Sequence, residues 1–194
     1  MHSTNIPVRI RSAMPADAAA IGAIHVAGWR AAYRGLMPDS ILAALDDSER
    51  AGFWHGVLDS THNVLVAELS GTVVGFCSVI PSRDQDVPKG VAAEIAALYV
   101  APERWRSGVG RALCSAASNA ALSAGFSELS LWVVAENERA VRFYEALGFI
   151  PDGEEKVESA SGSPDVCEMR MRRTLGFAPF VPLDSTAPHT TLPI

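Results

Sequence analysis

The segment Arg106-Ser107-Gly108-Val109-Gly110-Arg111 constrains the fold of this chain more than any other part of the sequence. A strand-like run, Glu94–Val100, precedes it, and a helix-like run over residues 112–124 follows it. The free N–H groups of a first helical turn point in one direction, and the helix dipole favours negative charge there. The sequence therefore predicts an anion site at a strand–turn–helix junction, where Arg106 and Arg111 add positive charge.

Two common phosphate-binding motifs do not fit this spacing. A Walker A loop requires a lysine after its last glycine, and none follows Gly108 or Gly110. The dinucleotide motif G-x-G-x-x-G/A would have Leu113 at its last position, and it belongs to the first strand of its fold, whereas about half of this chain precedes the loop. A plain helix start with glycine in the turn stays open as the alternative.

Composition and charge exclude several classes of protein. A chain of 194 residues with 48% hydrophobic and 20% charged residues is typical of one soluble globular domain. Its apolar runs are shorter than the roughly 20 residues of a membrane span, and its N-terminus lacks the order of a signal peptide. The three widely spaced cysteines indicate reduced thiols, with neither disulfides nor a zinc site. The net charge of -6 argues against a general nucleic-acid surface and allows a cationic substrate, such as an amine, to be drawn to the protein. We therefore expect a cytoplasmic protein without metal, nucleic-acid or membrane partners.

Periodicity and turn residues predict strands that alternate with helices. The predicted strands cover residues 8–11, 63–69, 72–81, 94–100, 129–134, 150–158 and 166–172, and the predicted helices cover residues 18–33, 39–45, 47–58, 112–124 and 137–147. Only Ser70-Gly71 separates the second and third strands, which indicates a tight hairpin. This order predicts an α/β (mixed α+β) domain with about seven strands over residues 7–174. Residues 175–194, with four prolines, are expected to form a tail outside it.

Two motifs stand at a fixed distance in the second half of the chain. The first is Leu98-Tyr99-Val100-x-Pro102 leading into the loop, and the second is N-x-x-A-x-x-F-Y-E-x-x-G-F over residues 137–149. Together they resemble the GNAT superfamily of acetyl-CoA-dependent N-acetyltransferases. The resemblance covers about residues 7–174 and implies a central, mostly antiparallel sheet with helices on both faces. Trp105 departs from the family pattern, which often has Gln or Arg there, and Arg106 supplies a cation one residue later.

The resemblance implies acetyl-CoA as the co-substrate. Its pyrophosphate would lie on the loop residues Arg106, Ser107, Gly108, Val109, Gly110 and Arg111. Its pantetheine arm would lie along the backbone of Leu98, Tyr99 and Val100. Asn137 matches a further coenzyme contact. An ordinary core strand and a helix N-cap are the alternative roles of these last residues, and both are compatible with ligand contact.

The resemblance also implies two catalytic residues. Tyr144 matches the general acid near the coenzyme sulfur, since a phenol with a pKa of about 10 stays protonated and can donate to a thiolate. Glu94 matches a frequent base that accepts the amine proton directly or through water. The alternatives are a core tyrosine and a solvent-exposed charge at a strand end. Polarisation of the thioester carbonyl is expected from a backbone N–H near Leu98 or Tyr99.

The acceptor site is less determined by the sequence. Trp29 and Tyr33 share a helix face and match the segment that lines the acceptor pocket in the family; packing against the sheet is the alternative. His25 and His55 are expected in core or surface roles, and Trp132 in the core.

We expect acetyl transfer to a primary amine of a small molecule, by direct attack in a ternary complex. A protein or peptide N-acetyltransferase is one alternative, and a non-catalytic acyl-CoA sensor on the same fold is the other. By analogy with the family, we expect a homodimer.

Overall fold

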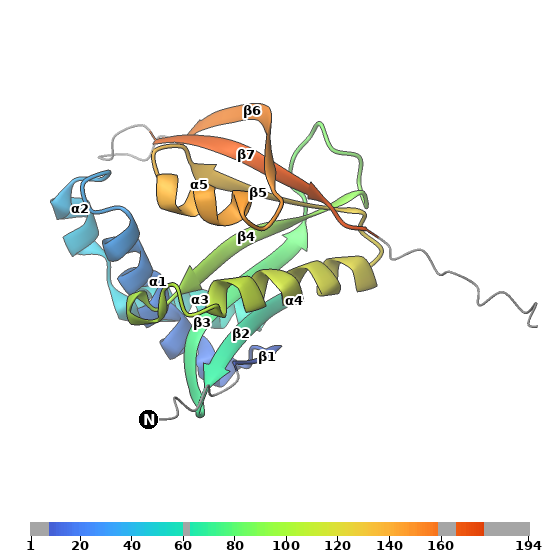
Figure 1. Ribbon diagram of the computed structural model, residues 1–194. Coiled ribbons are helices and arrows are strands. Elements are labelled where there is room, and N and C mark those ends of the chain that lie inside the picture. The colour runs from blue at the N-terminus through green and yellow to red at the C-terminus, as the bar shows by residue number, and fades with distance from the viewer. Residues whose placement is uncertain (1–7, 60–62, 159–165, 177–194) are drawn as a thin grey trace, which may run out of the picture.

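A seven-stranded sheet with helices on both faces forms the protein (Figure 1). The computed structural model describes residues 8–59, 63–158 and 166–176. The strands are β1 (Arg9–Ser12), β2 (Asn63–Leu69), β3 (Thr72–Pro81), β4 (Ala92–Val100), β5 (Glu128–Val134), β6 (Ile150–Glu158) and β7 (Val166–Thr174). Their spatial order is β1-β2-β3-β4-β5-β7-β6. Only the β4–β5 pair is parallel, so the expected mostly antiparallel sheet is confirmed.

The helices divide between the two faces of the sheet. They are α1 (Ala18–Ala32), α2 (Asp39–Ala44), α3 (Asp47–Leu58), α4 (Val109–Ser123) and α5 (Glu138–Glu145), with short 3₁₀ turns at Pro15–Asp17 and Pro102–Arg104. α4 and α5 cover the larger core cluster, which includes Leu113 and Tyr144. α1 and α3 cover the opposite face through Ile21 and Trp54, which pack on Phe76. No helix of the described ranges has the length and apolarity to cross a membrane.

Local sequence signals explain most of the element ends. Ser70 and Gly71 both have positive φ (50° and 81°), as the predicted two-residue hairpin between β2 and β3 requires. The side chain of Asp46 accepts a hydrogen bond from the Glu49 N–H at 2.8 Å and caps α3. α5 ends at Glu145 with Ala146 as its C-cap, two residues before the predicted end, and Gly148, with φ of 83°, follows three positions beyond the helix.

Helix α4 begins at Val109, three residues before its predicted start. Gly108, with φ of 89°, is its N-cap, so Gly110 lies in the first helical turn. A Cβ atom at Gly110 would lie 3.1 Å from Cζ of Phe143. The second glycine therefore lets α4 pack closely on α5, a role that the sequence pattern did not reveal.

The domain extends at least one residue beyond its predicted end. Leu175 is only 5% exposed and belongs to the larger core cluster. Its N–H donates to the Ser127 carbonyl at 2.7 Å. The remainder of the expected tail, residues 177–194, and the expected turn between β6 and β7 lie outside the described residues.

Candidate functional site

The parallel strands β4 and β5 pair at their beginnings and then part. Ala92–Ile95 pairs with Glu128–Leu131, but β4 continues to Val100 and β5 continues to Val134. Figure 1 shows the two ribbons side by side at first and separate at their ends. On the β3 side, Ala96 is an additional residue that makes a bulge, which bends β4. The second half of β4 therefore presents an edge toward a gap in the sheet.

Backbone direction decides which groups face this gap. The N–H of Ala101 donates to β3 at 2.9 Å, and alternate residues of a strand point the same way. Tyr99 therefore bonds to β3, whereas Leu98 and Val100 face the gap. The Val100 carbonyl accepts a hydrogen bond from Nε1 of Trp105 at 2.8 Å. Leu98 is thus the residue whose N–H and carbonyl both remain directed at the gap.

The loop after β4 presents a row of backbone N–H groups. Arg106 and Gly108 both have positive φ, at 63° and 89°. The first hydrogen bond of α4 runs from the Ala112 N–H to the Gly108 carbonyl, at 3.0 Å. Within the described ranges, no acceptor is found for the N–H groups of residues 106–111. A Cβ atom at Gly108 would meet nothing within 4 Å, so the loop is open on that side. Such a loop suits an anion.

Side chains hold this loop in place. The Ser107 hydroxyl donates to the Arg104 carbonyl at 2.6 Å. The guanidinium of Arg139 from α5 stacks over the Trp105 ring at 3.6 Å from its centroid. Trp105, the departure from the family pattern, therefore links the loop to both β4 and α5.

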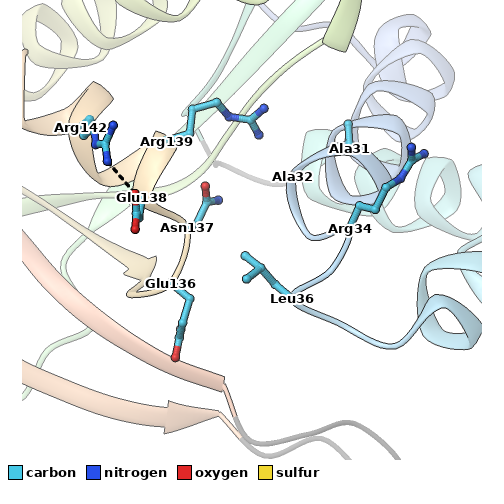
Figure 2. A pocket seen from close by; sticks show the side chains of 9 residues that line it. All are labelled: Ala31, Ala32, Arg34, Leu36, Glu136, Asn137, Glu138, Arg139 and Arg142. Atoms are coloured by element: carbon cyan, nitrogen blue, oxygen red, sulfur yellow. Dashed lines mark hydrogen bonds and ion pairs between the residues drawn. The ribbon is translucent and has the colours of Figure 1, made fainter.

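A pocket of about 500 Å³ lies between the end of α1 and the start of α5 (Figure 2). Its lining residues are Ala31, Ala32, Arg34, Leu36, Glu136, Asn137, Glu138, Arg139 and Arg142. Asn137 caps α5, because its Oδ1 accepts a hydrogen bond from the Ala140 N–H at 3.2 Å. Among the described residues, no acceptor is found for its amide Nδ2. Asn137 can therefore cap the helix and still donate into the pocket.

Tyr144 points from α5 into the core on the same side of the sheet as α4. It is 9% exposed and lies between Phe143 and Phe149, with ring centroids 5.1 and 5.7 Å away. It shares a core cluster with Val100 and Val133, which come from the strands on either side of the gap. Burial raises the pKa of Tyr144 well above its ordinary value, so the phenol stays protonated. In the described part of the chain, its hydroxyl has no hydrogen-bond partner.

Glu94 is not a solvent-exposed charge at the end of a strand. It is 2% exposed, and it pairs with Ser130 just before β4 and β5 separate. Arg83, from the β3–β4 connection, donates to its carboxylate from Nη2 at 2.5 Å, from Nε at 3.2 Å and from its backbone N–H at 3.3 Å. The alternative of an exposed charge is therefore wrong, and Glu94 is a buried, paired carboxylate.

An aromatic cluster lies under α1, beside the C-terminal end of β4. The Trp29 indole donates to the Tyr99 hydroxyl at 2.7 Å, and Tyr33 contacts Trp29 edge-on at 5.1 Å. His25 stacks on Tyr99 at 4.4 Å and accepts a hydrogen bond from Trp54 at 3.0 Å. Burial lowers the pKa of His25 to about 3 and raises that of Tyr33 to about 12, so both are neutral. His25 is structural, as expected.

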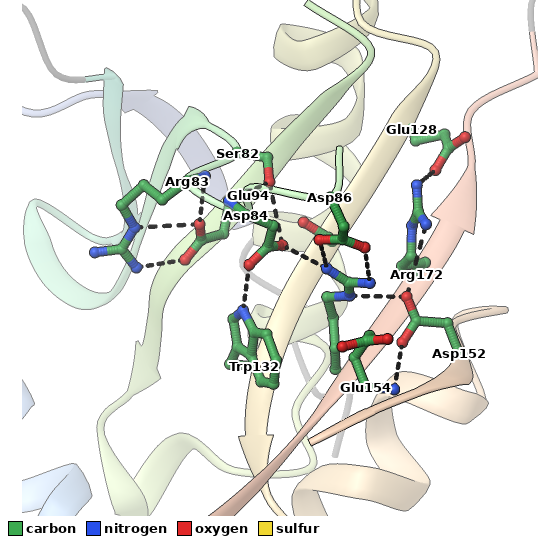
Figure 3. A network of polar contacts seen from close by, with 12 residues as sticks. Ser82, Arg83, Asp84, Asp86, Glu94, Glu128, Trp132, Asp152, Glu154 and Arg172 are labelled. Atoms are coloured by element: carbon green, nitrogen blue, oxygen red, sulfur yellow. Dashed lines mark hydrogen bonds and ion pairs between the residues drawn. The ribbon is translucent and has the colours of Figure 1, made fainter. Parts of the chain in front are cut away.

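A network of charges covers the sheet beside Glu94 (Figure 3). Arg170 of β7 is 3% exposed and contacts Asp84, Asp86 and Asp152 at 3.3, 2.6 and 2.8 Å. Trp132 is half-buried, and its Nε1 donates to Asp84 at 3.1 Å. The expectation of a core role for Trp132 is therefore wrong. Its side chain lies on the face of the sheet that carries these charges.

Arg83 and Arg170 were not predicted as part of the site from the sequence. A signal existed for Arg170, because Glu168, Arg170 and Arg172 alternate with cysteine and methionines in β7, which indicates a strand with one polar face. Nothing in the sequence pattern distinguished Arg83. In the described ranges, no three His, Cys, Asp or Glu side chains lie close enough to hold a metal ion.

Known proteins are similar to this chain in sequence and in fold. The sequence model described as "Acetyltransferase (GNAT) family" matches residues 29–149. YuaI of Bacillus subtilis, an uncharacterized N-acetyltransferase, is 34% identical over 140 residues, which cover 72% of this chain and 78% of YuaI. The structure of yncA from Salmonella typhimurium with its cofactor acetyl-CoA aligns with a TM-score of 0.65 and 24% identity, over 87% of this chain and 94% of that one. The PaiA N-acetyltransferase of Thermoplasma acidophilum, solved with coenzyme A, aligns with a TM-score of 0.64 and 20% identity, over 87% and 99% of the two chains.

Proposed function

The chain belongs to the acetyltransferase (GNAT) family and is an acetyl-CoA-dependent N-acetyltransferase, and we propose that it acetylates a primary amine of a small molecule by direct attack in a ternary complex. One observation carries the proposal: the β4–β5 gap lies directly beside a loop whose N–H groups have no acceptor among the described residues. A pantetheine arm joined to a pyrophosphate needs that combination of an open strand edge and an anion site. We assign the activity to the domain expected over residues 7–174.

The donor would be held mainly by backbone groups. The pyrophosphate takes the N–H groups of residues 106–111, and the side chains of Arg106 and Arg111 add charge. The pantetheine arm pairs with the gap-facing edge at Leu98 and Val100. Tyr99 would only border the coenzyme site without hydrogen bonding to the ligand, because its backbone bonds to β3 and its hydroxyl to Trp29. The amide Nδ2 of Asn137, which has no acceptor among the described residues, provides a further donor.

The chemistry then needs a base, an acid and an oxyanion donor. The amine nitrogen attacks the thioester carbon, the Leu98 N–H donates to the carbonyl oxygen, and the C–S bond breaks. Tyr144 gives its proton to the departing thiolate, for which its protonated hydroxyl, without a hydrogen-bond partner in the described ranges, is suited. Glu94 takes the proton of the amine. Leu98 lies four positions beyond Glu94, about 13 Å along extended strand. One water cannot span that distance, so the amine would give its proton to Glu94 first and then move along the strand to the thioester.

The acceptor side favours a slim, unhindered amine. Glu94 is 2% exposed, so only a narrow terminus can approach it. The rings of Trp29 and Tyr33 lie on the α1 side and would contact the apolar part of the acceptor. A lysine side chain or a peptide N-terminus shares this chemistry and is the alternative outcome of the test.

Two measurements on the purified protein test the proposal. Calorimetry should detect acetyl-CoA binding, and free thiol should appear when amines, polyamines, amino acids, aminoglycosides or peptides are added. Thiol release without amine is the blank. Turnover with small amines supports the proposal, and turnover with peptides alone overturns its small-molecule part. Binding of acetyl-CoA without turnover on any amine would overturn the acceptor chemistry.

A further inference from the structure

Arg83 stands between the buried carboxylate of Glu94 and the solvent. The Arg83 side chain is 66% exposed, whereas the Glu94 side chain is 2% exposed. The guanidinium contacts both carboxylate oxygens, at 2.5 Å from Nη2 and 3.2 Å from Nε. In Figure 3 it covers the carboxylate from the side of the β3–β4 connection. An amine that approaches Glu94 therefore meets the guanidinium first.

The backbone that carries Arg83 is held on both sides. Ser82 and Asp84 bond to each other through the serine hydroxyl at 3.2 Å. Arg170 binds Asp86 with two hydrogen bonds, at 2.7 and 2.6 Å, and lowers the pKa of Asp86 to about 2. The connection is thereby anchored to β7. If Arg83 moves, its long side chain therefore moves while its backbone stays in place.

A carboxylate as buried as Glu94 needs a cationic partner at all times, because an unpaired buried charge is costly. An alkylammonium ion carries the same charge as a guanidinium and also donates hydrogen bonds. Exchange of one for the other keeps Glu94 paired throughout. A neutral amine cannot make this exchange, because displacing the guanidinium would leave the buried carboxylate without a cation.

We propose that Arg83 is a specificity-determining residue, whose guanidinium occupies the place of the acceptor's ammonium group and yields it only to a cation. This inference rests on the proposed function, in which Glu94 receives the amine proton. After the exchange, an ammonium N–H bond breaks and a carboxylic O–H bond forms. Both charges disappear together, and the neutral amine can leave the carboxyl group and move to the thioester at Leu98. The second proton, which the nitrogen loses once the new C–N bond has formed, passes to Tyr144 after Tyr144 has given its own proton to the thiolate.

A pair of primary amines with the same two-carbon chain but different charge tests the exchange in steady-state kinetics. Near neutral pH, ethylamine is an ammonium ion and trifluoroethylamine is uncharged. Arg83→Ala should lower KM for ethylamine about fivefold, or about 1 kcal/mol for a partly exposed ion pair. KM for trifluoroethylamine should stay the same, and Arg83→Lys should keep the wild-type values. An equal shift for both amines, or no decrease for ethylamine, overturns the proposal.

Arg9→Ala is the matched control, because Arg9 is 72% exposed and pairs with Glu68 on β1 and β2, away from the site. It should leave both KM values unchanged. If Arg9→Ala also lowers KM for ethylamine, the effect is one of net charge, and the role of Arg83 is refuted.

A thermal measurement tests the same exchange without turnover. Arg83→Ala leaves Glu94 unpaired, so its Tm should fall and should recover when ethylammonium chloride is added. Sodium chloride at equal ionic strength should not restore it, nor should ethylammonium in the double variant Arg83→Ala/Glu94→Gln. Absence of a selective recovery contradicts the proposal. If recovery occurs without turnover on any amine, only the proposed function fails.

Discussion

The two ends of β4 are built from different chemical groups. At its C-terminal end, the strand edge at Leu98 and the loop of residues 106–111 offer backbone N–H groups that no described residue occupies. At its N-terminal end, the buried Glu94 is paired with the side chain of Arg83, and Arg170 belongs to the neighbouring charge network with Asp84 and Asp86. A backbone site keeps its donors when side chains change, whereas a side-chain site does not. We call the C-terminal end, which would hold acetyl-CoA, the donor end, and the N-terminal end, which would meet the amine, the acceptor end. The donor end should therefore tolerate substitution of its side chains, and the acceptor end should not.

Tyr144 is the exception to this contrast and gives the largest expected effect. It lies toward the C-terminal end of β4 but would act through its side chain. Tyr144→Phe should lower kcat by about a hundredfold or more, since positioned acids contribute about 10²–10⁴. The Kd for acetyl-CoA and the Tm should change little, because the hydroxyl has no partner in the described structure. The rate of thiol release gives kcat, titration calorimetry gives the Kd, and thermal unfolding gives the Tm. An unchanged kcat would show that Tyr144 is not the acid of the mechanism.

Gly108 tests whether the backbone conformation of the donor end is essential. Its φ is 89°, so Gly108→Val should distort the loop at a cost of about 1–3 kcal/mol. We expect acetyl-CoA to bind about tenfold more weakly in calorimetry, with kcat at saturating acetyl-CoA retained. Gly125 is the matched control: it has φ of 90° beyond the other end of α4, and a Cβ there meets nothing within 4 Å. If Gly125→Val weakens binding equally, the loss comes from general strain.

Beside the C-terminal end of β4, His25 stacks on Tyr99 and should make stability depend on pH. The pKa of His25 falls from 6.5 to about 3 on folding because of burial. The neutral form is therefore favoured in the folded state, and its contribution is complete above pH 6.5 and is lost as pH falls toward 3. Urea unfolding should give a free energy that decreases by up to about 1.4 kcal/mol per pH unit from this group.

His25→Gln should reduce that slope, since glutamine does not titrate there and can still accept from Trp54. His55 is the control, because its side chain is 58% exposed, and His55→Gln should leave the slope unchanged. Equal slopes in wild type and His25→Gln would mean that His25 is already exposed to protons in the folded protein.

Arg106 should give the smallest effect. Its φ of 63° is unfavourable for a side chain, so Arg106→Gly should raise stability by about 1 kcal/mol. The Kd for acetyl-CoA should rise less than about threefold, as expected where one exposed cation is lost and the backbone donors remain. Calorimetry and urea unfolding measure the two quantities. A tenfold loss of affinity would make the donor end a side-chain site.

Sequence patterns predicted the elements that depend on neighbouring residues. Ser70-Gly71 specified the β2–β3 turn, and Asn137 specified the start of α5, because turn and cap chemistry is local. The break in β4–β5 pairing after Ile95 was not predictable, since it depends on the register between strands far apart in the sequence. Trp132 was misassigned because its centre-strand position gave no sign of the charged face that β7 completes.

The partners of the catalytic residues were also beyond the sequence. Glu94 and Arg83 are eleven positions apart, across a connection whose path only the folded chain defines. Arg170 reaches Asp86 from 84 positions away. Long-range pairs of this kind follow from topology, whereas the glycines and the asparagine of the donor end can be predicted from short motifs.

The most direct test of the division along β4 is the Glu94→Gln variant, measured for acetyl-CoA binding and turnover in the same preparation. The variant should bind acetyl-CoA with the wild-type Kd, because the donor is held by backbone groups at the other end of the strand. Its kcat should fall by about a hundredfold or more, since the amine loses its proton acceptor. Undiminished turnover, or a loss of acetyl-CoA affinity comparable to the loss of turnover, would contradict the account.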